Sequence, residues 1–128
     1  MGRITALYAG LNALIMLALA LNVVRGRTRA KVGLGDGGDA GLTRAIRAHG
    51  NNIEYVPILL LLLLGLEFGA WPAWLLHTLG LAFTVGRVTH AIGLNQTSGT
   101  SIGRAIGMLT AWIGMLIAAA LNIWRFIA

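Results

Sequence analysis

The chain has 128 residues, of which 57% are hydrophobic and 11% are charged, and its mean hydropathy is +0.78. Soluble domains have about a quarter of their residues charged, so this composition excludes a water-soluble globular domain and indicates a membrane protein. The chain contains no cysteine, which excludes disulfides, thiolate metal sites and a nucleophilic thiol of its own. A net charge of +6 would suggest nucleic-acid binding in a soluble domain, but here membrane topology explains it better.

The first predicted membrane span covers residues 4–24. This stretch has no charged residue, and it is long enough to cross a hydrocarbon core of about 30 Å. With Ala18-Leu19-Ala20 as a cleavage site it would also fit a signal peptide. The arginines and the lysine that follow it oppose export, so we expect a retained span.

The second span is predicted at about residues 48–67, on a helix that begins near Leu42 or Thr43. Its uncharged part, residues 55–66, is too short to cross the membrane alone, so the bilayer must begin near Ala48. Asn51 and Glu54 then lie inside the membrane. The proline at position 57 predicts a local bend in this helix.

The third and fourth spans are predicted at about residues 71–91 and 101–127. Trp71-Pro72 favours a helix start at the membrane interface. The fourth span has small residues every three or four positions, which is typical of a helix-packing face. These residues are Gly103, Gly107, Ala111, Gly114 and Ala118. The sequence therefore predicts one all-α domain over residues 1–128, an integral membrane four-helix bundle.

Positive charge is concentrated where the first and third loops would meet. The cations in or beside these loops are Arg25, Arg27, Arg29, Lys31, Arg44, Arg47, Arg87 and Arg104. Arg3 and Arg125 lie at the opposite end. By the positive-inside rule, both termini face the non-cytoplasmic side of an inner membrane, and the loops with the polar residues face the cytoplasm.

Four polar residues share one stripe of the second helix. Arg44, Arg47, Asn51 and Glu54 follow helical spacing. A carboxylate that begins a membrane-embedded run is costly unless it faces a partner or a wet cavity. A cation, an amide and an anion on one stripe predict a binding site for a small zwitterion. The alternative is an Arg47–Glu54 ion pair that only anchors the helix.

Arg87, His90 and Arg104 are expected at the same membrane level as this stripe. Arginine is suited to bidentate carboxylate recognition, and it can stabilise a thiolate through charge-assisted hydrogen bonds. The arginines outnumber the one glutamate, so the expected ligand is anionic overall and carries an amine for Glu54.

The whole chain resembles the MAPEG superfamily (membrane-associated proteins in eicosanoid and glutathione metabolism), in particular its bacterial, microsomal glutathione transferase-like branch. The motifs that carry the resemblance are Arg47-xxx-Asn51-xx-Glu54-Tyr55-x-Pro57 before a leucine run, Gly35-Asp36-Gly37-Gly38-Asp39 upstream, Arg87-xx-His90, and Arg104 at the start of the fourth span.

The resemblance implies a homotrimer with glutathione bound between neighbouring subunits as a co-substrate. It implies that Arg47, Asn51, Glu54 and Tyr55 bind glutathione, with Arg87 beside them. Arg104 is the expected thiolate-stabilising residue, and Arg27 is the expected contribution of the adjacent subunit. The implied activity is conjugation of glutathione to a hydrophobic electrophile, or reduction of a lipid hydroperoxide. The small-residue ridge of the fourth span also favours trimers.

The chain departs from the family pattern on the third span, where His90 and Leu94 stand in place of tyrosines. His90 could donate to the thiolate, or it could be favoured only by the helix dipole. Three alternatives remain: a glutathione- or lipid-binding protein without catalysis, a small proton-coupled multidrug exporter, and a bis-histidine haem site at His49 and His90. No metal site is predicted.

Overall fold

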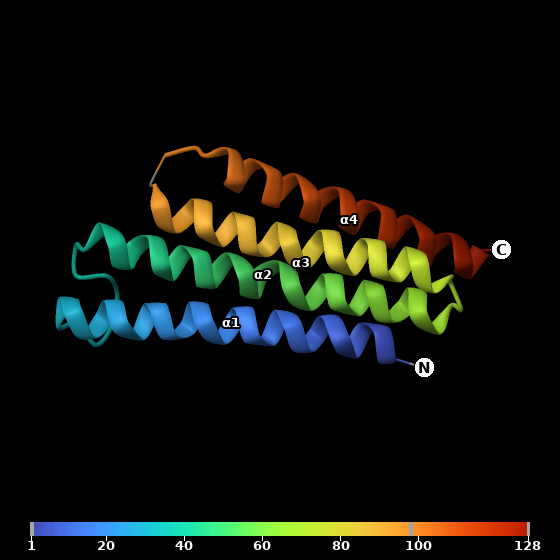
Figure 1. Ribbon diagram of the computed structural model, residues 1–128, viewed down its shortest axis with the longest axis horizontal. Coiled ribbons are helices and arrows are strands. Elements are labelled where there is room, and N and C mark those ends of the chain that lie inside the picture. Colours follow the sequence, from blue (N-terminus) through green and yellow to red (C-terminus); the bar gives the residue numbers. More distant parts are fainter. Residues whose placement is uncertain (1, 98, 128) are drawn as a thin grey trace.

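The computed structural model describes residues 2–97 and 99–127, which form a bundle of four helices (Figure 1). These are α1 (Arg3–Ala30), α2 (Ala40–Phe68), α3 (Ala73–Gln96) and α4 (Ile102–Ile127). Successive helices run in opposite directions, so both ends of the chain lie at one end of the bundle. The predicted all-α, four-helix architecture is confirmed.

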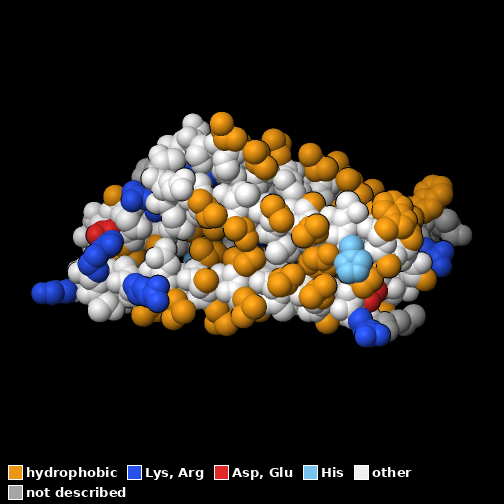
Figure 2. Space-filling model, in the orientation of Figure 1, with side chains coloured by type: hydrophobic (Ala, Val, Ile, Leu, Met, Phe, Trp, Pro, Cys, Tyr) orange, Lys and Arg blue, Asp and Glu red, His pale blue; other side chains and the backbone are white. Residues whose placement is uncertain are grey.

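Three of these helices, α1, α2 and α4, are long and apolar enough to cross a membrane. Helix α3 has 24 residues, lies beside them and carries the polar side chains of His77, Arg87 and His90. It begins two residues later than the predicted third span, because Pro72 takes the extended cap position. Figure 2 shows hydrophobic side chains over most of the bundle, with Lys and Arg gathered mainly at the end that holds the α1–α2 loop.

The α1–α2 loop is organised by two aspartates. Asp39 caps α2 by accepting a hydrogen bond of 2.7 Å from the Leu42 N–H, so the helix begins at Ala40, slightly before the predicted start. Asp36 accepts bonds from the Gly38 N–H at 3.0 Å and the Thr43 hydroxyl at 2.7 Å. These donors, the backbone N–H groups first, lower the pKa of both carboxyls.

The small-residue ridge of α4 packs against α3 of the same chain. A Cβ atom on Gly107 would lie 2.5 Å from the Gly86 carbonyl oxygen and 2.5 Å from the His90 Cβ atom. A Cβ atom on Gly103 would lie 3.0 Å from the Thr89 carbonyl oxygen. The predicted packing face is confirmed at Gly103 and Gly107, whereas a Cβ atom on Gly114 would meet nothing within 4 Å. The packed part of the face is used within the subunit, so it gives no support to trimer formation. Its close approach fixes the position of His90 against α4.

The end of the bundle near the termini is closed by Glu67 of α2. Its carboxylate accepts bonds from the Ile4 N–H at 3.1 Å, the Thr5 N–H at 2.8 Å and the Thr5 hydroxyl at 2.7 Å. It thereby caps the first turn of α1, whose N–H groups have no partner within the helix. In the same half of the bundle, the Tyr8 hydroxyl lies 3.0 Å from His77 Nδ1.

Two asparagines of α1 connect it to α3. The buried Asn12 donates to the Thr84 hydroxyl at 2.9 Å. Asn22 donates to the Asn95 side-chain oxygen at 3.1 Å. Interhelical hydrogen bonds of this kind replace part of the hydrophobic driving force that helices lack in lipid.

Candidate functional site

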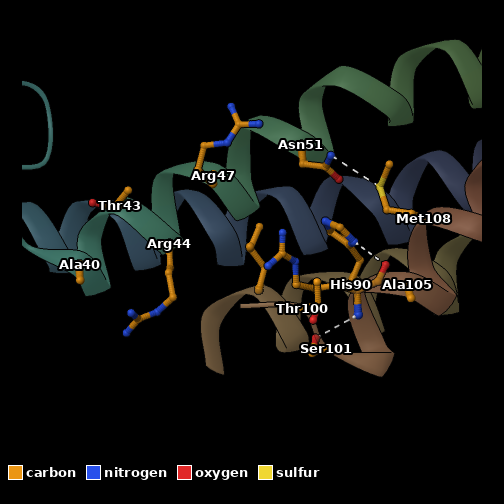
Figure 3. Close-up of a pocket in the computed structure, with 12 residues that line it drawn as sticks. Ala40, Thr43, Arg44, Arg47, Asn51, His90, Thr100, Ser101, Ala105 and Met108 are labelled. Atoms are coloured by element: carbon orange, nitrogen blue, oxygen red, sulfur yellow. Dashed lines mark hydrogen bonds between the residues drawn. The ribbon is translucent and has the colours of Figure 1, made fainter. Parts of the chain in front are cut away.

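A cavity of about 580 Å³ lies between the first half of α2, the C-terminal turns of α3 and the N-terminal turns of α4 (Figure 3). This volume is within the range of small-molecule sites. Its polar lining residues are Thr43, Arg44, Arg47, Asn51, His90, Thr100, Ser101 and Arg104. Among the residues that the structure describes, three arginines and no carboxylate line it, so it is suited to an anion.

Four of the predicted site residues meet at this cavity: Arg47, Asn51, His90 and Arg104. They come from three helices, and helical spacing explains why each helix presents its residues on one side. The predicted stripe of α2 faces the cavity as far as Asn51. The sequence did not predict the contribution of Met108, which lies one helical turn beyond Arg104 on α4. Extending the Arg104 stripe by four residues would have found it.

Asn51 is held on both sides of its amide group. Its oxygen accepts a bond of 2.9 Å from Arg87 Nη2. Its nitrogen lies 3.8 Å from the Met108 sulfur as a donor (Figure 3). Arg87 is only 2% exposed, and its guanidinium carbon lies 5.5 Å from the centre of the Tyr55 ring. Arg87 therefore does not line the cavity. It lies behind Asn51 and fixes the direction of the amide.

The contact of His90 with α4 determines its tautomer. Its Nδ1 lies 3.1 Å from the Arg104 carbonyl oxygen, which can only accept, so Nδ1 carries a proton. In the neutral ring the other nitrogen, Nε2, is then an acceptor. The expected donation from His90 to a thiolate therefore requires a second proton on the ring. A neutral His90 can instead accept a proton from a ligand.

Arg104 lies in the first turn of α4. Its N–H donates to the Ser101 side-chain oxygen at 3.3 Å, an N-cap contact, and its guanidinium donates to the Gly99 carbonyl oxygen. The positive end of the α4 dipole adds to the charge of the side chain here. Both effects favour an anionic group at this end of the cavity.

Three other predicted site residues lie outside the cavity. Glu54 is exposed one turn beyond Asn51 on the same stripe, and within the described chain it forms no ion pair with Arg47. The anchoring pair considered above is therefore not formed. The Tyr55 hydroxyl accepts a bond of 3.1 Å from the Trp112 indole N–H. Arg27 donates to the Gly33 carbonyl oxygen at 3.3 Å and lines a separate groove beside Lys31.

Comparison with known proteins identifies the family of the chain. A model of the MAPEG family matches residues 5–124. The chain is 36% identical to the "Inner membrane protein YecN" of Escherichia coli K12 over 121 residues, which cover 94% of this chain and 91% of that protein. The protein of the same name from Escherichia coli O6:H1 matches to the same extent. With its four-helix fold and its apolar helices, the chain is a membrane protein that belongs to the MAPEG family.

Proposed function

We propose that the cavity binds glutathione and that the protein is a glutathione transferase or peroxidase of the bacterial inner membrane. The observation that carries the proposal is the convergence of Arg47, Asn51, His90 and Arg104, from three helices, on one cavity. The name of the Escherichia coli relatives supports the inner-membrane location. The concentration of cations at the α1–α2 loop supports a cytoplasmic opening of the cavity.

Glutathione offers two carboxylates, one amine and one thiol. Arg44 and Arg47 can bind a carboxylate in the bidentate manner that favours arginine over lysine. The amide of Asn51 is oriented in advance by Arg87, which lowers the entropy lost on binding. An anionic ligand with these groups matches the excess of positive charge in the cavity.

The exposed position of Glu54 supports assembly into a trimer. A carboxylate on the outer face of α2, beside the membrane-embedded run, is costly if lipid covers it. A second subunit packed against this face would cover it and would complete the site, with Glu54 available for the amine of glutathione. Arg27 of that subunit would then contribute its charge from the end of α1.

The proposed reaction depends on two groups that would lie beside the thiol of glutathione, His90 and Arg104. The thiol of glutathione has a pKa of about 8.5 when unperturbed, so it is mostly protonated at neutral pH. Transfer of its proton to His90 Nε2 leaves a thiolate, and the guanidinium of Arg104 stabilises this reactive form. The sulfur then attacks an electrophilic carbon, a C–S bond forms, and the leaving group departs with its electron pair.

A lipid hydroperoxide would be attacked at its terminal oxygen. The O–O bond breaks, the alkoxide leaves and takes a proton to become the alcohol, and the sulfur is oxidised to a sulfenic acid. A second glutathione reduces this to glutathione disulfide and water. The cavity is bordered by helices with apolar outer faces, so a substrate dissolved in the bilayer has a lateral route to the sulfur.

Calorimetric titration of glutathione in detergent tests the binding step. We expect Arg47→Ala and Glu54→Gln each to weaken binding by about 1.5 kcal/mol, the loss of a charge-assisted hydrogen bond. Arg3→Ala, at the opposite end of the bundle, is the matched control for charge and should bind as the parent does. Unchanged affinity in both site variants would refute the assignment.

Turnover of a chloronitrobenzene with glutathione tests catalysis separately. Arg104→Ala should keep most of the glutathione affinity and lose the ultraviolet absorbance of the bound thiolate together with most of the turnover. Glutathione binding without product formation in the parent protein would identify a binding protein that is not an enzyme. That second function is favoured by the third span, where Leu94 lines the cavity in place of a hydroxyl-bearing side chain.

A further inference from the structure

A second polar cavity, of about 490 Å³, lies on the other side of the start of α2. It is enclosed by the end of α1, the first turn of α2 and the end of α3, and its lining includes Asn22, Arg25, Arg29, Gly41, Arg44 and Asn95. Arg44 lines both cavities and so forms part of the wall between them. Apart from Arg44, the residues that line this second cavity have no part in the proposed glutathione site.

Two guanidinium groups converge beside Gly41 at this cavity. The position that a Cβ atom on Gly41 would take is 3.0 Å from Asp39 Oδ1, 3.1 Å from Arg29 Nη2 and 3.8 Å from Arg44 Nη2. The absence of a side chain at position 41 therefore lets the two cations approach the same point, with the Asp39 carboxylate beside them. Arg29 also contacts the Asp39 carboxylate at 3.4 Å. With Arg25, three arginines and this one carboxylate leave an excess of positive charge.

The polar wall of the cavity is fixed by hydrogen bonds between three helices. Asn22 of α1 donates to the Asn95 side-chain oxygen at 3.1 Å, and Arg44 Nε of α2 donates to the Asn95 backbone oxygen at 3.2 Å. The Asn95 amide nitrogen in turn donates to the Ala91 carbonyl oxygen at 2.8 Å. The site is thus preorganised, which reduces the cost of ordering it around a ligand.

The depth of the cavity in the bundle points to a lipid. Arg25 is the first charged residue after the apolar stretch 4–24 of α1, so it lies where the hydrocarbon core ends. Leu14 and Leu21, 66% and 54% exposed, lie with the exposed Leu11 and Ala18 on the stripe of α1 that leads to Arg25. An acyl chain along this stripe would bring its phosphate to the arginines.

We propose that this second cavity is a site for a phosphate group, supplied by an anionic phospholipid whose acyl chains lie along the Leu11–Leu21 stripe. Arginine binds phosphate oxygens through paired N–H donors, and basic pockets between membrane helices bind anionic headgroups. Free inorganic phosphate shares this headgroup chemistry, but it has no acyl chain to contact the apolar stripe.

Native mass spectrometry of the whole protein, with phosphatidylglycerol or phosphatidylcholine added in mild detergent, tests the proposal. The parent should retain phosphatidylglycerol preferentially. The double variant Arg25→Gln with Arg29→Gln should lose about tenfold or more of that retention, since two cations near the headgroup are removed. The matched control, Arg27→Gln with Lys31→Gln, removes the same charge from the same end of α1 but from the other groove, and it should retain the lipid. Gly41→Val, whose side chain would displace the Arg29 guanidinium without changing the charge, should also lose it.

Three results would overturn the proposal. Equal loss in the two double variants would mean general attraction to the basic end of the bundle. Full retention in Gly41→Val would place the phosphate outside the cavity. In phosphatidylcholine nanodiscs, thermal protection by inorganic phosphate equal to that given by phosphatidylglycerol would assign the site to a soluble anion. Glutathione affinity measured on the Arg25→Gln, Arg29→Gln double variant, which leaves Arg27 and Arg47 in place, keeps this test separate from the proposed function, which does not depend on its outcome.

Discussion

Replacing Arg87 with methionine should separate glutathione affinity from stability. The Arg87 side chain is 2% exposed, and it donates a 2.9 Å bond to the Asn51 amide oxygen. Without that donor the Asn51 amide is free to rotate away from the ligand. A hydrogen bond from a charged group contributes about 1.5 kcal/mol or more, so glutathione should bind about tenfold more weakly.

The stability of the same variant should not fall. Within the described chain, Arg87 Nε and Nη1 have no hydrogen-bond partner. The free energy lost by removing this cation from water is therefore only partly offset in the native protein. Replacing such a group with an apolar side chain of similar length is commonly neutral or stabilising. We therefore expect an unchanged or higher melting temperature in detergent, together with the weaker binding.

A double-mutant cycle checks that Arg87 acts through Asn51. In an Asn51→Ala background, Arg87→Met should cause little further loss of affinity, because the group that it orients is gone. Val85→Met, at an exposed position of the same helix, is the control for the added methionine and should bind glutathione normally. Unchanged affinity in Arg87→Met, or losses that simply add in the double variant, would refute the positioning role.

Three further predictions concern the bundle and its assembly. Glu67→Ala removes the acceptor for two N–H groups and a hydroxyl of α1, so it should destabilise the protein by about 1–2 kcal/mol, as lost caps do; an unchanged melting temperature would contradict this role. Gly107→Val should lower the melting temperature far more than Gly114→Val, because a Cβ atom at 107 meets the α3 backbone at 2.5 Å whereas one at 114 meets nothing within 4 Å; equal effects would contradict the α3–α4 packing. Native mass spectrometry in mild detergent should give trimers, and monomers alone would contradict the role proposed for Glu54.

Helical periodicity is the reason that much of the site could be predicted from the sequence. Arg47 and Asn51 lie on the same face of any helix that contains both, so only the direction in which that face points depends on the fold. The start of α2 was predicted only approximately, near Leu42 or Thr43, although the Asp39 cap that sets it depends on neighbouring residues alone. The buried position of Arg87 and the capping of α1 by Glu67 were not, because both depend on how whole helices rotate and slide against each other.

The position of Glu54 shows a second reason why the sequence alone does not define the site. The sequence placed Glu54 correctly on the stripe with Asn51, but the cavity within one chain ends before it. An exposed carboxylate indicates a partner surface only because contact with lipid would be costly for it. The tautomer of His90 also needed the structure, because it depends on the Arg104 carbonyl oxygen of a different helix. Sequence alone could identify His90 as a polar group, but it could not say whether the ring donates or accepts.

The most direct test of the central claim is an experimental structure of the protein purified with excess glutathione. The account predicts density for the tripeptide in the cavity between α2, α3 and α4, with Arg47 and Asn51 within hydrogen-bonding distance of it and its sulfur beside Arg104 and His90. A cavity that stays empty at saturating glutathione, or glutathione bound away from these residues, would contradict the account.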